Sequence, residues 1–376
     1  MAVNCGIVGL PNVGKSTIFS ALSSSRAEVA NYPFCTINPN VGVVNVVDER
    51  LDNLAEVFKP KRKIPAAVEF VDIAGLVKGA SEGEGLGNQF LSHIREVGVV
   101  AHVIRCFDDP DIIHVANKVD PDADIETINV ELALADLETL AKRRDKVERS
   151  LKVQGKQEQK LAETILAALG KIEAVLEKGG RALSAVLSDD EKAAVYDCHF
   201  ITMKPQVYVC NVDEDGMKAF ASGRPSGYVV AVQRRAGAEG AEAVVICGKF
   251  EAELVGIEDA EEKKAFLAEI GLEKPGLSAL IHAAYHLLGL RTFFTVGADE
   301  CKAWTIHAGD TAPKASSVIH TDFEKNFIKA EVYSYDDIVL YGSEAKIKEA
   351  GKFRIEGKEY IVQDGDVMFI RAGKAC

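Results

Sequence analysis

Residues 9–16 read Gly9-Leu-Pro-Asn-Val-Gly14-Lys15-Ser16, a loop with the spacing Gly-x4-Gly-Lys-Ser. An apolar run within residues 3–10 leads into the loop, and residues of helical character follow it. In this strand–loop–helix context the glycines let consecutive backbone N–H groups turn toward a phosphate, and the helix N-terminus adds a favourable dipole. The stretch therefore predicts a P-loop that binds a nucleotide.

The side chains at the end of the loop complete the predicted phosphate site. Lys15 is expected to supply a cation to the β- and γ-phosphates and to assist catalysis. Ser16 is expected to offer its hydroxyl to Mg²⁺, which prefers hard oxygen ligands in octahedral geometry and would arrive with the nucleotide. From this loop, nucleotide contacts are assigned to Asn12, Val13, Gly14, Lys15, Ser16 and Thr17.

Two further segments are expected at the same site. Asp72-Ile-Ala-Gly75 comes at the end of the expected strand Glu69–Asp72, which would bring a carboxylate to the metal and the Gly75 N–H to the γ-phosphate. Thr36 lies in a loop between the first helix and the second strand, where a second hydroxyl would reach the metal. The predicted metal ligands are therefore Ser16, Thr36 and Asp72.

The group that orients the attacking water is not given by the usual motif. Many related nucleotidases carry glutamine directly after the glycine of the Asp-x-x-Gly motif, whereas this chain carries Leu76. Either hydrolysis is slow or another group supplies the orientation. His93, His102 and His114 are the candidates, on or after the glycine-rich segment 79–87.

Two strings compete as the site that reads the base. Asn117-Lys-Val-Asp120 matches the guanine motif Asn-Lys-x-Asp, but too few residues separate it from the strand ending near Cys106 for a crossover and another strand. Asn211-Val-Asp-Glu214 directly follows the apolar strand Gln206–Cys210. Its glutamate would not meet guanine as aspartate does, so this string favours adenine.

Alternating apolar strands and helical segments predict a doubly wound α/β sheet. Leucines at three- and four-residue spacing in residues 124–180 predict an inserted α-helical hairpin, and short strands after Arg291 predict a small C-terminal α+β module. We expect a nucleotide-binding domain in two parts, residues 1–123 and 201–288. Residues 124–200 would form the helical insertion between them, and residues 289–376 the C-terminal domain.

Composition sets the broad class. The 376 residues contain 47% hydrophobic and 27% charged residues, as in an ordinary globular protein of two or three domains. A net charge of −13 argues against DNA as a partner, and Lys59-Pro-Lys-Arg-Lys63 is interpreted as a solvated loop. The cysteines are scattered, and the sequence shows neither a signal-like N-terminus nor an apolar run of transmembrane length. We therefore expect a cytoplasmic protein that does not bind a membrane. We also expect a monomer.

Taken together, these motifs resemble the YchF/Obg-like ATPases, in the Obg branch of P-loop nucleotidases, over nearly the whole chain. The segments that carry the resemblance are Gly9–Thr17, Asn31-Tyr-Pro-Phe-Cys-Thr-Ile37, Asp72–Ala80, Gly85–Leu91, the Asn-x-x-Glu string at 211–214, Arg291–Gly297, Ala303–Ile306 and Ile319–Glu324. The last three resemble a TGS module, which implies a ubiquitin-like β-grasp fold.

The resemblance implies a cytosolic ATPase that prefers ATP to GTP, with Mg²⁺. Asn211 and the backbone of Val212 would meet adenine, Glu214 would complete the motif, and Phe107 would pack against the ring. The histidine that replaces the glutamine would be His114. The helical hairpin and the TGS module would bind partners, chiefly the ribosome.

Two departures and two alternatives stay open. The string ending at Asp120 completes a guanine motif that the family does not use, and Cys247 stands where related nucleotidases carry a serine-alanine loop beside the base. The chain is therefore alternatively a GTP-dependent translation switch that reads guanine through Asn117–Asp120. A third hypothesis, motivated by Leu76, is a non-enzymatic adaptor that nucleotide stabilises.

Overall fold

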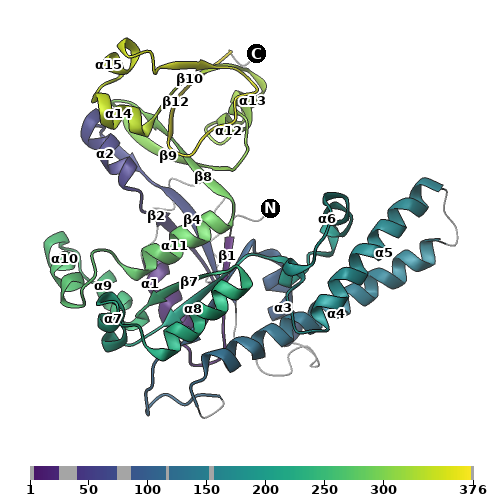
Figure 1. The fold of residues 1–376 in the computed structure, drawn as a ribbon. Coiled ribbons are helices and arrows are strands. Elements are labelled where there is room, and N and C mark those ends of the chain that lie inside the picture. The colour runs from purple at the N-terminus through teal and green to yellow at the C-terminus, as the bar shows by residue number, and fades with distance from the viewer. Residues whose placement is uncertain (1–3, 25–39, 74–85, 116–117, 152–155, 374–376) are drawn as a thin grey trace. The chain divides into compact units, whose positions relative to one another are not determined.

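The computed structural model describes residues 4–24, 40–73, 86–115, 118–151 and 156–373 (Figure 1). These residues form two compact units. The first contains the described residues within 1–25, 34–42 and 69–284, and the second contains those within 43–68 and 285–376.

The first sheet has the strand order β2-β4-β1-β5-β6-β7. Its pairings of β1 with β4 and β5, of β5 with β6, and of β6 with β7 are parallel. Every residue of β5 and β6 is buried, which explains why these strands read as continuous apolar runs. The strands are β1 (Asn4–Val8), β2 (Val41–Val46), β4 (Ala66–Asp72), β5 (Val99–Arg105), β6 (Gln206–Asn211) and β7 (Glu242–Ile246).

Helices connect these strands, as parallel pairing requires. Helix α8 packs against β6 and β7, and α1 packs against α9. The doubly wound α/β architecture predicted from the sequence is confirmed. The connecting helices include α1 (Lys15–Ser24), α3 (Leu86–Glu96), α7 (Glu214–Ala221) and α8 (Gly227–Glu239). Three more helices follow β7, the last strand of this sheet: α9 (Gly248–Val255), α10 (Ala260–Glu269) and α11 (Gly276–Leu287).

The predicted helical hairpin is also confirmed. Helices α4 (Pro121–Leu151) and α5 (Lys156–Leu176) lie side by side between β5 and β6 in the sequence (Figure 1). Their contact buries apolar side chains that include Leu140, Leu169 and Ile172. In the described ranges, neither these helices nor any other is long and apolar enough to cross a membrane.

A buried carboxylate ties the hairpin to the chain that returns to the sheet. Asp136 on α4 accepts hydrogen bonds from the backbone N–H groups of Ile201 and Thr202 and from the Thr202 hydroxyl, at 2.7–2.8 Å. These bonds satisfy a carboxylate that has no exposed surface. The returning chain contains η2 (Ala182–Ser184), α6 (Asp189–Val195), η3 (Tyr196–Cys198) and η4 (Ile201–Met203).

The second sheet has the order β11-β10-β12-β8-β9-β3 and mixes antiparallel with parallel pairs. With its short helices it forms the predicted α+β module, consistent with a β-grasp fold. The strands are β3 (Arg62–Ile64), β8 (Leu290–Val296), β9 (Glu300–His307), β10 (Phe327–Ser334), β11 (Arg354–Glu356) and β12 (Asp366–Ala372). The helices are α2 (Glu49–Phe58), α12 (Ala312–Ser316), α13 (Thr321–Lys325), α14 (Tyr335–Tyr341) and α15 (Glu344–Glu349).

The second unit also contains residues 43–68, which the sequence had placed in the nucleotide-binding domain at 1–123. The difference arises because β3 pairs in parallel with β9, and α2 packs against β8 and β9. Part of the basic stretch 59–63 is therefore an edge strand rather than the expected loop. Its cations are neutralised locally, since Lys61 pairs with Asp299 at 2.8 Å and Arg62 with Glu300 at 3.4 Å.

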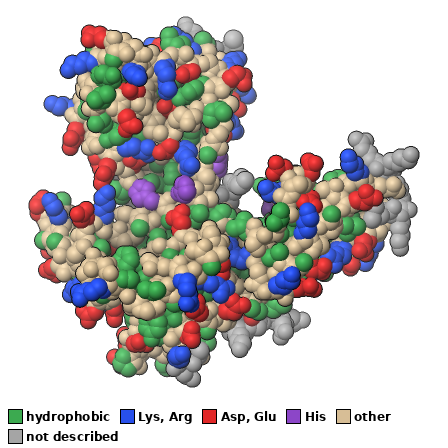
Figure 2. Space-filling view, viewed as in Figure 1, with side chains coloured by type: hydrophobic (Ala, Val, Ile, Leu, Met, Phe, Trp, Pro, Cys, Tyr) green, Lys and Arg blue, Asp and Glu red, His purple; other side chains and the backbone are tan. Residues whose placement is uncertain are grey.

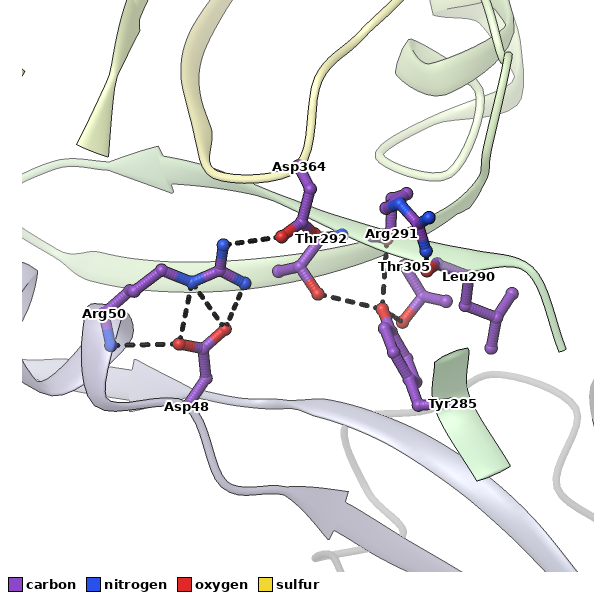
Figure 3. A network of polar contacts seen from close by, with 8 residues as sticks. All are labelled: Asp48, Arg50, Tyr285, Leu290, Arg291, Thr292, Thr305 and Asp364. Carbon is purple, nitrogen blue, oxygen red and sulfur yellow. Dashed lines mark hydrogen bonds and ion pairs between the residues drawn. The ribbon is translucent and has the colours of Figure 1, made fainter. Parts of the chain in front are cut away.

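Arg50 fastens α2 within this unit (Figure 3). Its guanidinium donates to Asp48 at 2.8 Å and to Asp364 at 2.7 Å, and it lies over the Phe294 ring at 5.3 Å. The other carboxylate oxygen of Asp364 accepts from the Thr292 N–H at 2.8 Å. One arginine thus joins α2 to β8 and to the loop before β12.

Candidate functional site

The loop between β1 and α1, predicted to bind phosphate, contains residues with positive φ angles. Asn12 and Gly14 have φ angles of 62° and 94°, in the left-handed region that favours glycine and asparagine. A Cβ atom on Gly14 would lie 2.2 Å from Nδ2 of Asn211, so the position excludes a side chain. The Ile18 N–H donates to the Gly14 carbonyl at 3.0 Å. Helix α1 therefore starts at the loop, where its N-terminus favours an anion.

Lys15 and Asp72 share one electrostatic environment. The Lys15 ammonium donates to the carbonyl oxygens of Gly9 at 3.0 Å and Leu10 at 3.4 Å. Burial lowers the pKa of Lys15, and the charge of Asp72 opposes that shift. Burial raises the pKa of Asp72, and Lys15 opposes it in turn. This proximity is the one expected of the cation and the carboxylate at a magnesium–phosphate site.

The residues present fit a magnesium ion that a nucleotide helps to hold. Ser16 is exposed at the start of α1, and Asp72 ends β4 opposite Ile7. Both present the oxygen ligands that Mg²⁺ prefers. Thr36 and Gly75 lie outside the described residues, as does Leu76. Within the described ranges, no group of three or more His, Cys, Asp or Glu side chains could hold a metal ion by itself.

A cavity of about 670 Å³ adjoins the phosphate loop. It lies at the carboxyl ends of parallel strands, where open α/β sheets bind their ligands. Its walls come from the P-loop and from the loops after β5, β6 and β7. The lining residues are Asn12, Gly14, Thr17, Phe107, Asp108, Asp109, Ile112, Asn211, Val212, Asp213, Glu214, Asp215, Cys247 and Lys249.

Asn211, predicted to meet adenine, makes two contacts within the protein. Its amide nitrogen donates to the Val13 carbonyl at 2.9 Å, and its amide oxygen accepts from the Gly248 N–H at 3.0 Å. The side chain therefore braces the P-loop against the start of α9. Its contact with adenine stays a prediction.

Val212 contributes a backbone group of defined polarity. Its N–H donates to the Ile246 carbonyl at 2.9 Å, as part of the connection between β6 and β7. A backbone contact from Val212 to a bound base would therefore run through the Val212 carbonyl oxygen, which is an acceptor.

Phe107 lines the cavity, as expected of a residue that packs against a base. Arg105 lies over its ring at 4.8 Å and is itself only 2% exposed. The Arg105 guanidinium donates to the carbonyl oxygens of Phe107, Asp109 and Ile112 at 2.9–3.1 Å. From inside the protein, this arginine holds the loop that forms one wall of the cavity.

The guanine-like string does not reach the cavity with its described residues. Lys118 and Asp120 are absent from the lining, and Asn117 lies outside the described part of the chain. Asp120 instead stands before α4, where its carboxylate accepts from the Ala123 N–H at 3.3 Å. No strand lies between β5 and α4 in the described residues, in agreement with the spacing argument.

His114, predicted to be catalytic, is 6% exposed, and its Nε2 lies 3.0 Å from Oδ2 of the buried Asp124. It follows the Arg105-held loop, and the Asn12 amide donates to the Ile113 carbonyl at 3.1 Å. His114 does not itself line the cavity, so its catalytic role stays a prediction. Of the other candidates, His93 is exposed on α3. His102 is buried in β5, where burial lowers its pKa to about 3.

Two residues of the site were missed by the sequence reasoning. Arg105 ends an apolar strand and gives no pattern of its own; a basic residue after a buried strand was the available signal. Lys249 lines the cavity and pairs with Glu214. Its signal was its place two residues after Cys247, close to the end of the strand β7.

Fold and site together define a P-loop nucleotidase with a GTPase-like nucleotide-binding domain. Residues 4–153 match the family model described as "50S ribosome-binding GTPase". Residues 290–373 match the YchF-GTPase_C model, described as "Protein of unknown function (DUF933)". The chain belongs to the YchF family, as the resemblance of its motifs predicted.

Full-length relatives support this assignment. The chain is 53% identical over 371 residues to the ribosome-binding ATPase YchF of Haemophilus ducreyi and 50% identical over 371 residues to that of Bacillus subtilis. Each alignment covers 99% of both proteins. The structure of the Schizosaccharomyces pombe YchF GTPase matches with a TM-score of 0.86 and 37% identity, over 98% of this chain and 97% of that one. A GTP-binding protein from Pyrococcus horikoshii, at 19% identity and a TM-score of 0.58, shares the fold.

Proposed function

We propose that this chain is a cytosolic, ribosome-binding ATPase that prefers ATP to GTP and hydrolyses it slowly. The observation that carries the proposal is that the P-loop and the Asn211–Glu214 loop line the same cavity. A triphosphate on Gly14 and Thr17 would place its base toward Phe107 and Val212. The family's relatives are named both ATPase and GTPase, so the base preference has to come from the residues themselves.

The backbone at Val212 favours adenine. Adenine presents an amino donor at the position where guanine carries the O6 acceptor. With its N–H engaged by Ile246, Val212 would offer a carbonyl acceptor, which matches the adenine amino group and repels O6 of guanine. Glu214 is one methylene longer than the usual aspartate, so its carboxylate would not meet the guanine N1–H and N2–H₂ donors in the same way.

The chain's own residues would bind and orient the triphosphate. Lys15 would exchange its present bonds to Gly9 and Leu10 for the β- and γ-phosphate oxygens. Ser16, Asp72 and Thr36 would hold Mg²⁺, which supplies charge neutralisation at the phosphates when bound. Leu76 cannot orient water, which is the basis for slow turnover. His114 is the proposed replacement, with Asp124 at its Nε2 as the group that would orient the imidazole.

A titration with magnesium and each triphosphate tests the base preference. We expect tighter binding of ATP than of GTP, and loss of both in Lys15→Ala. The paired change Val212→Lys with Glu214→Asp should shift the preference toward GTP. Tighter binding of GTP by the wild type would contradict the proposal. That result would favour the GTP-dependent switch, which further requires that Asp120→Asn weakens the binding of GTP and leaves the binding of ATP unchanged.

Co-sedimentation with ribosomes tests the partner. We expect the full chain to sediment with ribosomes and the bound fraction to differ between nucleotide-free and ATP-bound protein. If Lys15→Ala binds no nucleotide yet sediments as the ATP-bound wild type does, the nucleotide-stabilised adaptor becomes the better description. If neither the nucleotide-free nor the ATP-bound form sediments with ribosomes, the ribosome is removed from the proposal.

A further inference from the structure

Glu214 and Lys249 meet at the wall of the nucleotide cavity. Glu214 begins α7 after strand β6, and Lys249 lies in the first turn of α9 after strand β7. The Lys249 ammonium donates to Oε1 of Glu214 at 3.1 Å, and both residues line the cavity. An ion pair thus joins the two loops that flank the proposed base site.

Lys249 is the only basic side chain among the described lining residues. Against it stand five carboxylates, those of Asp108, Asp109, Asp213, Glu214 and Asp215. The hydrogen bond to Glu214 and its charge raise the pKa of Lys249, so the lysine is protonated at neutral pH. Of these carboxylates, Glu214 is the one to which Lys249 is hydrogen-bonded.

The neighbouring lining residues give Glu214 no comparable donor. Cys247 caps the start of α9 without a side-chain bond, and a thiol is a weak donor. Burial raises the pKa of the Cys247 thiol, which keeps it uncharged. Asp213 accepts from the Gly216 N–H at 2.8 Å, so its carboxylate caps α7. Among the described lining residues, Lys249 is the side chain that donates a hydrogen bond to the Glu214 carboxylate.

That hydrogen bond has a consequence for base choice. A carboxylate with open acceptor sites beside a base attracts the N1–H and N2–H₂ donors of guanine, whereas adenine lacks both. A lysine that already donates to the carboxylate competes with those donors. The lysine also presents only donors of its own, which guanine's N1–H and N2–H₂ cannot use.

We propose that Lys249 is a specificity-determining residue: by pairing with Glu214 it withholds the carboxylate from guanine and so favours adenine nucleotides. The inference rests on the proposed ATPase function and names a residue that sets its base preference. The pair is partly exposed, with 74% of the Lys249 and 41% of the Glu214 side chain accessible. The effect is therefore a moderate bias rather than an absolute barrier.

The test is the ratio of the dissociation constants of the β,γ-imido analogues of GTP and ATP, measured by calorimetry with Mg²⁺. Lys249→Met keeps the length and apolar stem of the side chain and removes its charge. We expect this variant to move the ratio about five- to tenfold toward GTP, because the carboxylate becomes available to guanine. Adding Glu214→Gln to Lys249→Met removes the carboxylate and should return the ratio to within about twofold of the wild type.

Lys218→Met is the matched control, because Lys218 is an exposed residue of α7 that does not line the cavity. Its ratio should equal that of the wild type. An unchanged ratio in Lys249→Met, or a shift that persists after Glu214→Gln is added, overturns the inference while ATP preference by the wild type still stands. A wild type that prefers the GTP analogue overturns the inference together with the proposed function.

Discussion

The side-chain amide of Asn211 donates to the backbone carbonyl of Val13 at 2.9 Å, across 198 residues of sequence. The same side chain accepts from the Gly248 N–H at 3.0 Å. Three loops at the carboxyl edge of the first sheet are thereby held in one arrangement: the P-loop, the loop after β6 and the start of α9. Asn211 is consequently a brace of the whole cavity, whichever base enters it.

Replacing Asn211 with alanine should weaken ATP and GTP binding by a similar factor. The change leaves the Val13 carbonyl and the Gly248 N–H without this partner in a buried setting, which costs about 1–3 kcal/mol. We expect a loss of affinity on the order of tenfold for each nucleotide, measured by calorimetry. Asn53→Ala, which removes an amide bonded to Tyr335 in the second unit, is the control and should change neither. A loss confined to ATP would instead make Asn211 a reader of adenine.

His114→Ala should lower turnover more than it lowers ATP affinity. If His114 acts on the reacting groups, its loss would reduce kcat on the order of 10²-fold. The dissociation constant for ATP should change less than about threefold, since the histidine lies outside the cavity lining. Steady-state kinetics and calorimetry on the same preparation separate the two effects.

The partner Asp124 provides the second arm of that experiment. Burial raises the pKa of Asp124, while the hydrogen bond from His114 opposes the rise. Asp124→Asn keeps a similar shape and removes the charge, so it should also reduce kcat if Asp124 orients the imidazole. If His114→Ala lowers the unfolding temperature and abolishes ATP binding without a separate effect on kcat, the histidine–aspartate pair is a structural element.

Glu251 predicts how stability depends on pH. It is buried on α9, where its carboxylate accepts from the N–H groups of Gly276 at 2.5 Å and Leu277 at 3.4 Å, at the start of α11. Burial raises its pKa from 4.5 to about 7. Between these values the folded protein keeps a proton that the unfolded chain has lost. The contribution of Glu251 to the free energy of unfolding is therefore full below about pH 4.5 and falls as the pH rises to about 7, by up to ~3 kcal/mol.

The variant Glu251→Gln retains an acceptor for the α11 N–H groups and cannot titrate. Urea unfolding of wild type and variant at pH 5, 6 and 7 should show a difference in free energy that shifts in favour of the variant as the pH rises. Taking the difference cancels the opposite trend of groups such as His102, whose lowered pKa makes its contribution weaken as the pH falls. A constant difference across this range would show that Glu251 is ionised throughout.

The sequence predicted the elements whose signal is local. The spacing Gly-x4-Gly14-Lys15-Ser identifies the P-loop, and a nearly continuous apolar run identifies β6. Both elements were therefore predicted at the positions that they occupy in the structure. Strand β3 has three residues, two of them basic, and forms only because β9 offers it an edge. Strand β10 (Phe327–Ser334) was missed as well, although its alternation of charged and apolar side chains is itself a strand signal; its antiparallel partners β11 and β12 come later in the sequence.

In the candidate site, too, the sequence predicted the local motifs but not the contacts between distant residues. Asn211 was identified from its motif, but its bond to Val13 depends on how two distant loops meet. Arg105 binds carbonyl oxygens of the loop that follows it, and backbone acceptors leave no mark in a sequence. His114 was named through a family resemblance, which says nothing of its burial beside Asp124. Pairwise side-chain geometry is thus the part that the structure adds.

Arg50 should be the main fastener of α2 in the second unit (Figure 3). Arg50→Met keeps an apolar stem but removes the guanidinium from Asp48, from Asp364 and from the Phe294 ring. We expect about 1–3 kcal/mol of lost local stability, because the bonds are charge-assisted and partly buried. Amide hydrogen exchange in α2 should therefore become faster by a factor between roughly five and a hundred, while exchange in β6 of the first unit stays unchanged.

The matched control is Arg62→Met, which removes the more exposed pair with Glu300 at 3.4 Å. An exposed pair contributes at most about 1 kcal/mol, so exchange in α2 should change little. Equal exchange rates in the Arg50 and Arg62 variants would assign the attachment of α2 to its apolar contacts with β8 and β9 instead.

The Arg50 variant should also affect the magnesium site. Because residues 43–68 connect Thr36 to Asp72 in the chain, loosening α2 should weaken magnesium-dependent ATP binding if those two residues hold the ion.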